Sequence, residues 1–209
     1  MLLALTALLS IASAFVSLDR ASVASDVLNN PRSVTLSDLQ SADDRVHTMA
    51  LLAVASYVVT GIVFVVWFQR CYKNANALGA SHLRFSSGWA AGAWFVPFLN
   101  FVRPKQIADD IWKSTDPEAP WPPSGSWLAN PVPLLIHLWW ALFIAGAVVA
   151  RIVASRAGNS NSLSEIRTLD RVAAAGQIVT VAGAILAALV VRAMTARAEQ
   201  RATRLGVIA

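Results

Sequence analysis

Four long stretches without charged side chains constrain this chain more than any other feature. They cover residues 1–18, 49–68, 132–150 and 172–191. An α-helix rises 1.5 Å per residue, so each stretch is close to the ~30 Å thickness of the hydrocarbon layer. Only 14% of the residues are charged, against about 25% in soluble domains. We therefore predict an all-α fold, an integral membrane four-helix bundle that forms a single domain over residues 1–209.

The first stretch has two interpretations. Ala12-Ser13-Ala14 resembles the small-x-small site at which secretory signals are cleaved. However, no Lys or Arg precedes the stretch, and its apolar run is long for a signal sequence. We expect residues 1–18 to be a retained span, with cleavage as the alternative.

A fifth apolar stretch, residues 88–102, is short and contains Pro97 and Asn100. Proline removes a helical hydrogen bond, and an unpaired asparagine is costly in lipid. We predict a re-entrant or interfacial segment rather than a full crossing.

The distribution of basic residues supports an even number of crossings. Loop 19–46 is poor in positive charge, whereas Arg70, Lys73 and Arg84 follow the second stretch. Four more arginines follow the last stretch: Arg192, Arg197, Arg201 and Arg204. Because Lys and Arg favour the cytoplasmic side, four crossings place both termini in the cytoplasm. The exception is loop 151–171, which carries four arginines and would face outside.

Residues 69–131 should then form a module on the cytoplasmic side. All eight tryptophans lie between Trp67 and Trp140, and tryptophan prefers the headgroup level. We expect residues 69–78 to continue the second span as far as a C-terminal cap at Gly79.

Two further elements are expected within this module, and one outside it. Residues 104–114 should form an amphipathic helix that lies on the membrane, with Ile107 and Ile111 on one face. Residues 116–133, rich in proline, should be an extended linker. On the outer side, residues 34–45 should form a short helix capped by Thr35 and Asp38.

Residues 63–114 carry a pattern that resembles a known family. The matching features are VWFQR followed by Asn74, then GWA with WFVPFLN, then RPKQIADDIW. They resemble the bacterial, mainly actinobacterial, multi-pass membrane family called domain-of-unknown-function family number 4328. The resemblance implies a retained first span and transfers no catalytic residue.

The usual chemical signatures are missing from the sequence. His47, His82 and His137 have no metal-ligand spacing, and the single cysteine, Cys71, has no histidine near it in sequence. The apolar stretches contain no Asp, Glu, Lys or Arg, which argues against ion transport. The adjacent pair Asp109 and Asp110 is expected to be solvated surface. We predict no enzyme, no cofactor and no metal. The net charge is +5. Because the basic residues lie at the ends of apolar stretches, we attribute this charge to membrane topology and attraction to anionic lipid rather than to nucleic-acid binding.

Small residues recur every four positions in the last two stretches. They include Gly146 and Ala150 in the third stretch, and Gly176, Thr180 and Ala184 in the fourth. This spacing lets helices approach closely, within the chain or with a partner. Gln177 and Thr180 are expected to hydrogen-bond a neighbouring helix.

These observations favour a non-enzymatic accessory or scaffold protein of the bacterial cell membrane. Its partners would be membrane lipids, other membrane proteins or further copies of itself. The candidate binding residues surround the aromatic run 94–100: Arg70, Lys73, Asn74, Arg84, Trp89, Trp94, Pro97, Asn100, Arg103 and Trp112. Together with Lys105, the basic members of this set would hold an anionic headgroup.

Three other readings stay open. The run 94–100 can be a purely structural break in the chain. The protein can be a small transporter or channel that uses residues 97–100 as a re-entrant element. It can also be a membrane enzyme acting on lipid through Asp109, Asp110 or His82.

Overall fold

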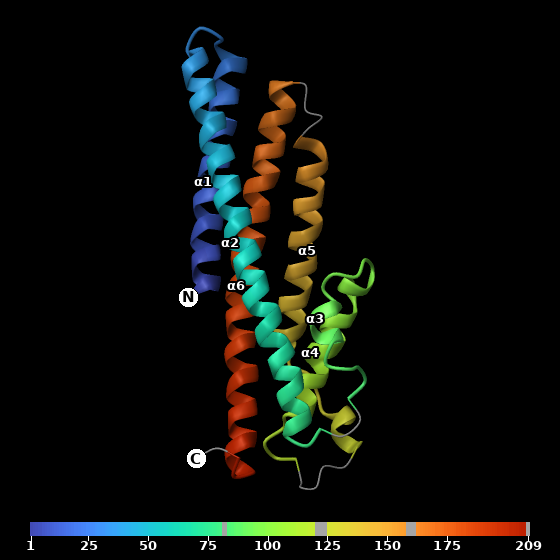
Figure 1. Cartoon of the computed structure of the whole chain (residues 1–209). Helices are drawn as coiled ribbons and strands as arrows, with labels where there is room; N and C mark the ends of the chain where they lie inside the picture. Colours follow the sequence, from blue (N-terminus) through green and yellow to red (C-terminus); the bar gives the residue numbers. More distant parts are fainter. Residues whose placement is uncertain (81–82, 120–124, 158–161, 208–209) are drawn as a thin grey trace. The chain divides into compact units, whose positions relative to one another are not determined.

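Every regular element in the described part of the chain is helical. The computed structural model describes residues 1–80, 83–119, 125–157 and 162–207. The long helices are α1 (Leu2–Asn29), α2 (Leu36–Ala77), α5 (Leu134–Ala157) and α6 (Leu163–Arg204). The short ones are α3 (Trp89–Gly92), η1 (Leu99–Phe101), α4 (Arg103–Ser114) and η2 (Gly125–Ala129) (Figure 1).

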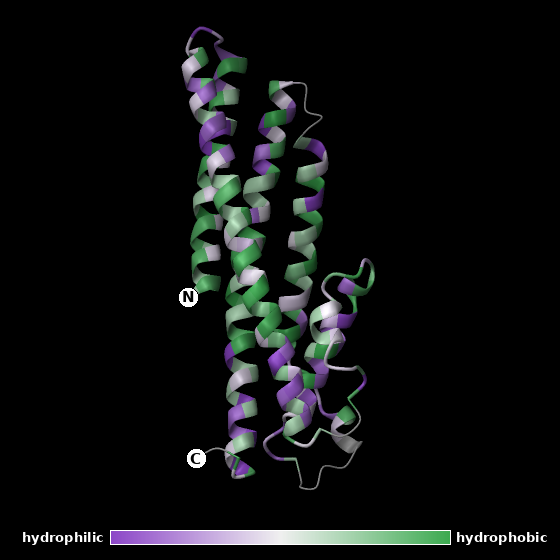
Figure 2. Cartoon of the chain, in the orientation of Figure 1, coloured by the Kyte–Doolittle hydropathy of each residue, from purple (hydrophilic) through white to green (hydrophobic). Residues whose placement is uncertain are grey.

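The four long helices are each long and apolar enough to cross a membrane. This confirms the predicted all-α fold with four membrane-crossing helices. Figure 2 shows that hydrophobic residues fill the middle of α2 and α6, while hydrophilic residues gather towards both ends of each helix.

Two of the long helices extend well beyond the predicted spans. α2 and α6 have 42 residues each, which corresponds to about 63 Å, roughly twice the hydrocarbon thickness. The predicted short helix 34–45 is therefore not a separate element but the first turns of α2. The predicted loop 151–171 is also wrong in part, because Arg151 and Arg156 lie on α5 whereas Arg167 and Arg171 lie on α6.

Local sequence signals set the ends of α2. At its start, the backbone N–H of Thr35 donates to Asp38 Oδ2 at 2.9 Å, and the N–H of Asp38 donates to Thr35 Oγ1 at 3.2 Å. At its end, Gly79 has φ 93°, and the N–H groups of Gly79 and Ala80 donate to the carbonyls of Asn76 and Ala75. Both caps confirm the sequence prediction, since these bonds satisfy backbone groups that the helix leaves open.

The chain divides into two compact units, and helices α2, α5 and α6 contribute to both. Unit 1 contains residues Met1–Thr60 and Ala141–Ile185, and unit 2 contains Gly61–Trp140 and Leu186–Ala209. The single domain over residues 1–209 stays a prediction.

In unit 1, α1 turns a small and polar face inward. Its buried residues are Thr6, Ser10, Ser13, Ser17, Ala21 and Ala24, whereas its leucines are mostly exposed. Thr6 Oγ1 lies 3.1 Å from Ser56 Oγ and 2.9 Å from Thr60 Oγ1 of α2. These contacts give residues 1–18 a place in the helical packing, and whether they are cleaved stays an open prediction.

Ion pairs connect the polar ends of three helices in unit 1. Arg20 of α1 donates to both carboxylate oxygens of Asp170, at 2.9 and 2.6 Å, and to Asp43 of α2 at 3.1 Å. Asp170 is buried on α6. A bidentate arginine satisfies this buried charge, which would otherwise be strongly unfavourable.

Glycines of α5 and α6 permit close approach of these two helices. A Cβ atom placed on Gly176 would lie 2.6 Å from Val149 Cγ1 of α5. Gly176 thus serves packing within the chain. The Thr180 hydroxyl donates to the carbonyl of Gly176 on its own helix at 3.1 Å, not to the neighbouring helix as predicted.

A matched pair of alanine substitutions tests this packing. Gly176→Ala should lower the free energy of unfolding in detergent by about 1–3 kcal/mol, because the added methyl group collides with the stiff side chain of Val149. Gly61→Ala in α2, whose added Cβ meets nothing within 4 Å, should be neutral or stabilising. Equal effects of the two substitutions would contradict the assigned α5–α6 contact.

Candidate functional site

Residues 88–102 form a chain of tight turns rather than a membrane-crossing helix. α3 has four residues and η1 has three. Ten backbone N–H groups donate to carbonyls within the segment or immediately before it: those of Trp89, Ala91, Gly92, Ala93, Trp94, Phe95, Leu99, Asn100, Phe101 and Val102. The segment thus supplies most of its own backbone hydrogen bonds, as irregular backbone must where water is scarce.

Trp94 anchors this segment against two long helices in unit 2. Its ring centroid lies 5.7 Å from that of Phe64, 5.7 Å from Phe68 and 6.0 Å from Trp140, all in edge-on arrangements. Its indole Nε1–H donates to the carbonyl of Ala90 at 3.1 Å. The indole is half-buried, with its one polar group satisfied and its rings packed against other rings.

The partners of Trp94 indicate the depth of the segment. Phe64 lies about 6 Å inside the end of the apolar stretch 49–68, and Trp140 lies about 12 Å inside the start of the stretch 132–150, at 1.5 Å per residue. The residues after Trp94 therefore begin at a level where the long helices are still apolar.

Beyond Trp94, the chain exposes a group of apolar side chains that we call the aromatic tip: Phe95, Val96, Pro97, Phe98, Phe101 and Val102. Phe95 is 76% exposed and Phe98 is 83% exposed. Figure 2 shows hydrophobic colouring along this loop beside α3. Two phenylalanines exposed to this extent at one site are unusual for a surface in water and indicate a binding surface.

Phe98 is also held in a strained backbone conformation. It has φ 64° and ψ −40°, and the N–H of Leu99 donates across it to the carbonyl of Pro97 at 2.8 Å. This is a γ-turn of the rare, strained type. Such strain typically costs about 1–3 kcal/mol and is concentrated at functional sites.

An ion pair between Arg84 and a buried carboxylate fixes the base of the segment. Arg84 Nε lies 2.8 and 3.0 Å from the two carboxylate oxygens of Asp110, and Arg84 Nη2 donates to the carbonyl of Gln106. The Tyr72 hydroxyl exchanges hydrogen bonds of 3.1 Å with the backbone N–H and carbonyl of Phe85. The expectation that Asp110 is solvated surface is wrong, because its side chain is fully buried.

The core of unit 2 contains the apolar face of α4. Pro104, Ile107, Ala108 and Ile111 are buried, together with residues of the long helices: Phe68, Tyr72, Ile136, Val190 and Met194. The prediction that this helix lies on the membrane through Ile107 and Ile111 is therefore wrong. Its apolar face is used within the protein, and the aromatic tip is the exposed apolar element instead.

The structure brings part of the predicted binding set together. Arg103 lies with its guanidinium carbon 4.2 Å from the ring centroid of Trp89 and 4.9 Å from that of Phe85. Asn100 hydrogen-bonds through its backbone to Val96 at 3.0 Å, and its buried Oδ1 has no partner. Trp89, Trp94, Pro97, Asn100 and Arg103 thus lie along one segment, with Arg84 at its base.

Other predicted residues lie elsewhere. Arg70, Lys73 and Asn74 are exposed on the final turns of α2. Trp112 lies on α4, where Arg197 of α6 stacks 4.5 Å from its ring centroid. His47 and His137 lie exposed on α2 and α5, while His82 and Trp121 fall outside the described residues. Within the described residues, no group of three or more His, Cys, Asp or Glu side chains could hold a metal ion.

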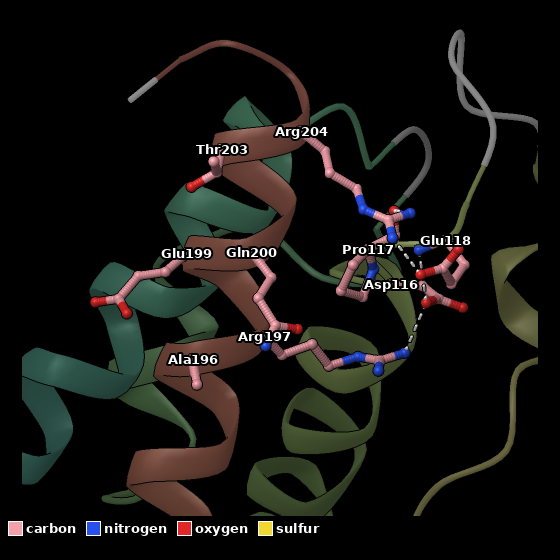
Figure 3. Close-up of a pocket in the computed structure, with 9 residues that line it drawn as sticks. All are labelled: Asp116, Pro117, Glu118, Ala196, Arg197, Glu199, Gln200, Thr203 and Arg204. Atoms are coloured by element: carbon pink, nitrogen blue, oxygen red, sulfur yellow. Dashed lines mark hydrogen bonds and ion pairs between the residues drawn. The ribbon is translucent and has the colours of Figure 1, made fainter. Parts of the chain in front are cut away.

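One set of contacts was not predicted from the sequence. Arginines at the end of α6 hold the segment that follows α4: Arg197 pairs with Asp116 at 3.2 Å (Figure 3). Arg197 also donates to the carbonyl of Trp112 on α4 at 3.0 Å. Arg204 pairs with Glu118 at 2.5 Å, and Arg201 donates to the carbonyl of Ala119. The signal for these contacts in the sequence is the spacing of Arg197, Arg201 and Arg204, which places them on one face of the helix.

A shallow pocket lies between this face of α6 and residues 116–118. Its charged lining residues are largely paired with one another, since Arg197 meets Asp116 and Arg204 meets Glu118. The pocket therefore marks a structural contact, and the aromatic tip is the better candidate site.

With this geometry established, the comparison with known families identifies the chain. The family model described as Domain of unknown function (DUF4328) matches residues 30–196. The chain belongs to this family. The DUF4328 match covers the aromatic tip and the whole of α4 but begins after α1, and the bacterial origin stays a prediction. No curated protein and no solved structure matches the chain.

In this DUF4328 protein, Arg84 and Asp110 do not share the desolvation cost of their ion pair equally. Burial raises the pKa of the Asp110 carboxyl above its ordinary value of 3.8, although the hydrogen bonds and charge of Arg84 act in the opposite direction. The same hydrogen bonds raise the pKa of Arg84. Because the Arg84 side chain is 40% exposed and the Asp110 side chain is not exposed, the carboxylate carries most of the desolvation cost.

Removal of the buried carboxylate should weaken unit 2. Asp110→Ala should lower the free energy of unfolding by about 2 kcal/mol, because Arg84 loses its partner and a small cavity is left. Asp109→Ala, which removes only an i,i+4 pair with Lys105, should cost about 0.5 kcal/mol or less. Thermal unfolding in detergent compares the two variants, and equal losses would contradict the assigned role of Asp110.

The raised pKa of Asp110 also predicts a pH dependence. A carboxyl whose pKa is higher in the folded state stabilises the fold fully below its unfolded pKa, and this contribution is lost as pH rises through the folded value. The unfolding free energy of the native protein minus that of Asp110→Asn should therefore fall as pH rises from about 3.8. A difference that grows with pH would show that Arg84 outweighs burial.

Proposed function

We propose that this DUF4328 protein is a non-enzymatic accessory or scaffold protein of the bacterial cell membrane that binds lipid through its aromatic tip. The observation that supports this most directly is an exposed apolar loop whose anchor, Trp94, packs on Phe64, Phe68 and Trp140 within apolar parts of α2 and α5. A loop at that level meets acyl chains rather than water.

The backbone of the segment suits the same environment. A peptide N–H without a partner costs several kcal/mol in hydrocarbon, so irregular chain is excluded there unless its polar groups are satisfied. The six N–H groups from Trp94 to Val102 that donate locally reduce this cost. An ordinary surface loop in water has no need for such local satisfaction.

The strain at Phe98 supports a function for the tip rather than a purely structural turn. Glycine at this position would adopt φ 64° without steric cost, yet the chain places a large aromatic ring there. The conformation turns that ring outward, where it is 83% exposed. Insertion of the ring into lipid would recover the hydrophobic free energy that exposure to water forfeits.

Basic residues suggest the side of the membrane on which the tip lies. Arg70 and Lys73 on α2, Arg103 and Lys105 on α4, and the arginines of the α6 end all belong to unit 2. By the positive-inside rule we assign this end of the bundle, and both termini, to the cytoplasm.

The accessory role implies partners within the membrane. Large apolar side chains are exposed along α2, among them Leu51, Val54, Val58 and Ile62, and these meet lipid, other membrane proteins or further copies of the chain. Gentle purification at native expression, followed by mass spectrometry of bound proteins and lipids, tests this role. A protein that always runs alone, without ordered lipid, contradicts it.

The depth of the tip can be measured with spin labels. In a Cys71→Ser background, a nitroxide on Phe98→Cys in phosphatidylcholine vesicles should collide more with oxygen than with a water-soluble nickel complex, because it lies among acyl chains. The matched control is Ser86→Cys, an exposed position before the segment, which should show the opposite preference.

Two results would overturn or redirect the proposal. A Phe98 label as accessible to nickel as the Ser86 label, with the protein folded, would place the tip in bulk water. If the nickel complex instead reaches the Phe98 label through a water-filled path within the bundle, the result would support a transporter or channel.

A further inference from the structure

We infer that Arg103 binds the phosphate of an anionic phospholipid headgroup at the edge of the aromatic tip. This inference rests on the proposed lipid contact of the tip and names the headgroup chemistry that the same site selects. The juxtaposition that carries it is an arginine stacked on two aromatic rings, directly after the last apolar residue of the tip.

The structure separates Arg103 from the other basic residues of the segment. Arg84 is held by both carboxylate oxygens of Asp110, and Lys105 pairs with Asp109 at 2.5 Å. Both therefore have their charge balanced within the protein. Among the basic side chains from Arg84 to Lys105 that the structure describes, Arg103 is the one that pairs with aromatic rings and not with a carboxylate.

The aromatic contacts of Arg103 are compatible with phosphate binding by its N–H donors. Its central carbon lies 4.2 Å from the Trp89 ring centroid and 4.9 Å from the Phe85 ring centroid, and an arginine that meets aromatic faces can still offer the N–H donors in its guanidinium plane to another partner. A planar fork of this kind binds two phosphate oxygens at once. The rings also restrict the side chain, so that less rotamer entropy is lost on binding.

The position of Arg103 in the chain fits the level of the lipid phosphates in a bilayer. Phe101 and Val102, the two residues before it, are 48% and 52% exposed and apolar, and α4 then leads into the protein core. An apolar pair followed at once by an arginine places the charge at the boundary between acyl chains and headgroups when the tip is inserted. A soluble anion would have no use for the neighbouring apolar surface, so we assign the site to a lipid.

Native mass spectrometry of the full chain, released from micelles, can test this assignment. The micelles contain equal amounts of phosphatidylglycerol and phosphatidylcholine with the same acyl chains. The native protein should retain phosphatidylglycerol about fivefold in preference, the factor expected for one basic residue near a membrane surface. Arg103→Gln should reduce the ratio to about one, and Arg103→Lys should keep part of it, because lysine is a point charge without the planar fork.

The matched control is Arg192→Gln, which removes an exposed arginine from α6 of the same unit and should leave the preference unchanged. Equal loss in Arg192→Gln and Arg103→Gln would overturn the site and indicate diffuse attraction. Displacement of phosphatidylglycerol by inorganic phosphate would show a site for free anions instead. Thermal unfolding of each variant in the same micelles shows whether it has folded, and retained preference in a folded Arg103→Gln also overturns the inference.

Failure of this inference is distinguishable from failure of the proposed function. The spin-label depth of the tip is measured in phosphatidylcholine alone and does not depend on headgroup charge. A deep label with no preference for phosphatidylglycerol removes the role of Arg103 and leaves the lipid contact. A label in bulk water removes both.

Discussion

The packing of Trp94 against Phe64, Phe68 and Trp140 is the interaction on which the rest of the site depends. It ties an irregular segment to helices that are continuous with two predicted spans. Without it, the segment could lie anywhere outside the bilayer. With it, the next residues begin at a level where α2 and α5 are still apolar, which fits both their local hydrogen bonds and their exposed apolar side chains.

The strained turn at Phe98 can persist because its surroundings are held on several sides. The Arg84–Asp110 pair and the Tyr72–Phe85 hydrogen bonds fix the chain before the segment and after it. The arginines of α6 fix the chain beyond α4. Each contact joins residues far apart in sequence, so the unit as a whole stabilises a conformation that one short segment could not keep.

The sequence predicted the features that depend on local patterns. Hydropathy was sufficient for the four membrane-crossing helices, and the caps at Thr35 and Gly79 followed from the residues beside them. It could not predict the burial of Asp110, because the partner that makes burial tolerable, Arg84, lies 26 residues earlier. The same reason explains why α4 was assigned to the membrane surface: its apolar face is covered by residues from distant helices. Arg103 likewise cannot be distinguished from Arg84 and Lys105 by sequence, because the carboxylates that pair with Arg84 and Lys105 are known only from the structure.

We propose that residues 88–102 enter the membrane and return on the same side. Single cysteines at Ser86 and Glu118, exposed positions on either side of the segment, can be labelled with a membrane-impermeant maleimide in a Cys71→Ser background. The account predicts that both positions react from one and the same face of sealed, oriented vesicles. Reaction of the two positions from opposite faces would show a fifth crossing and contradict the account.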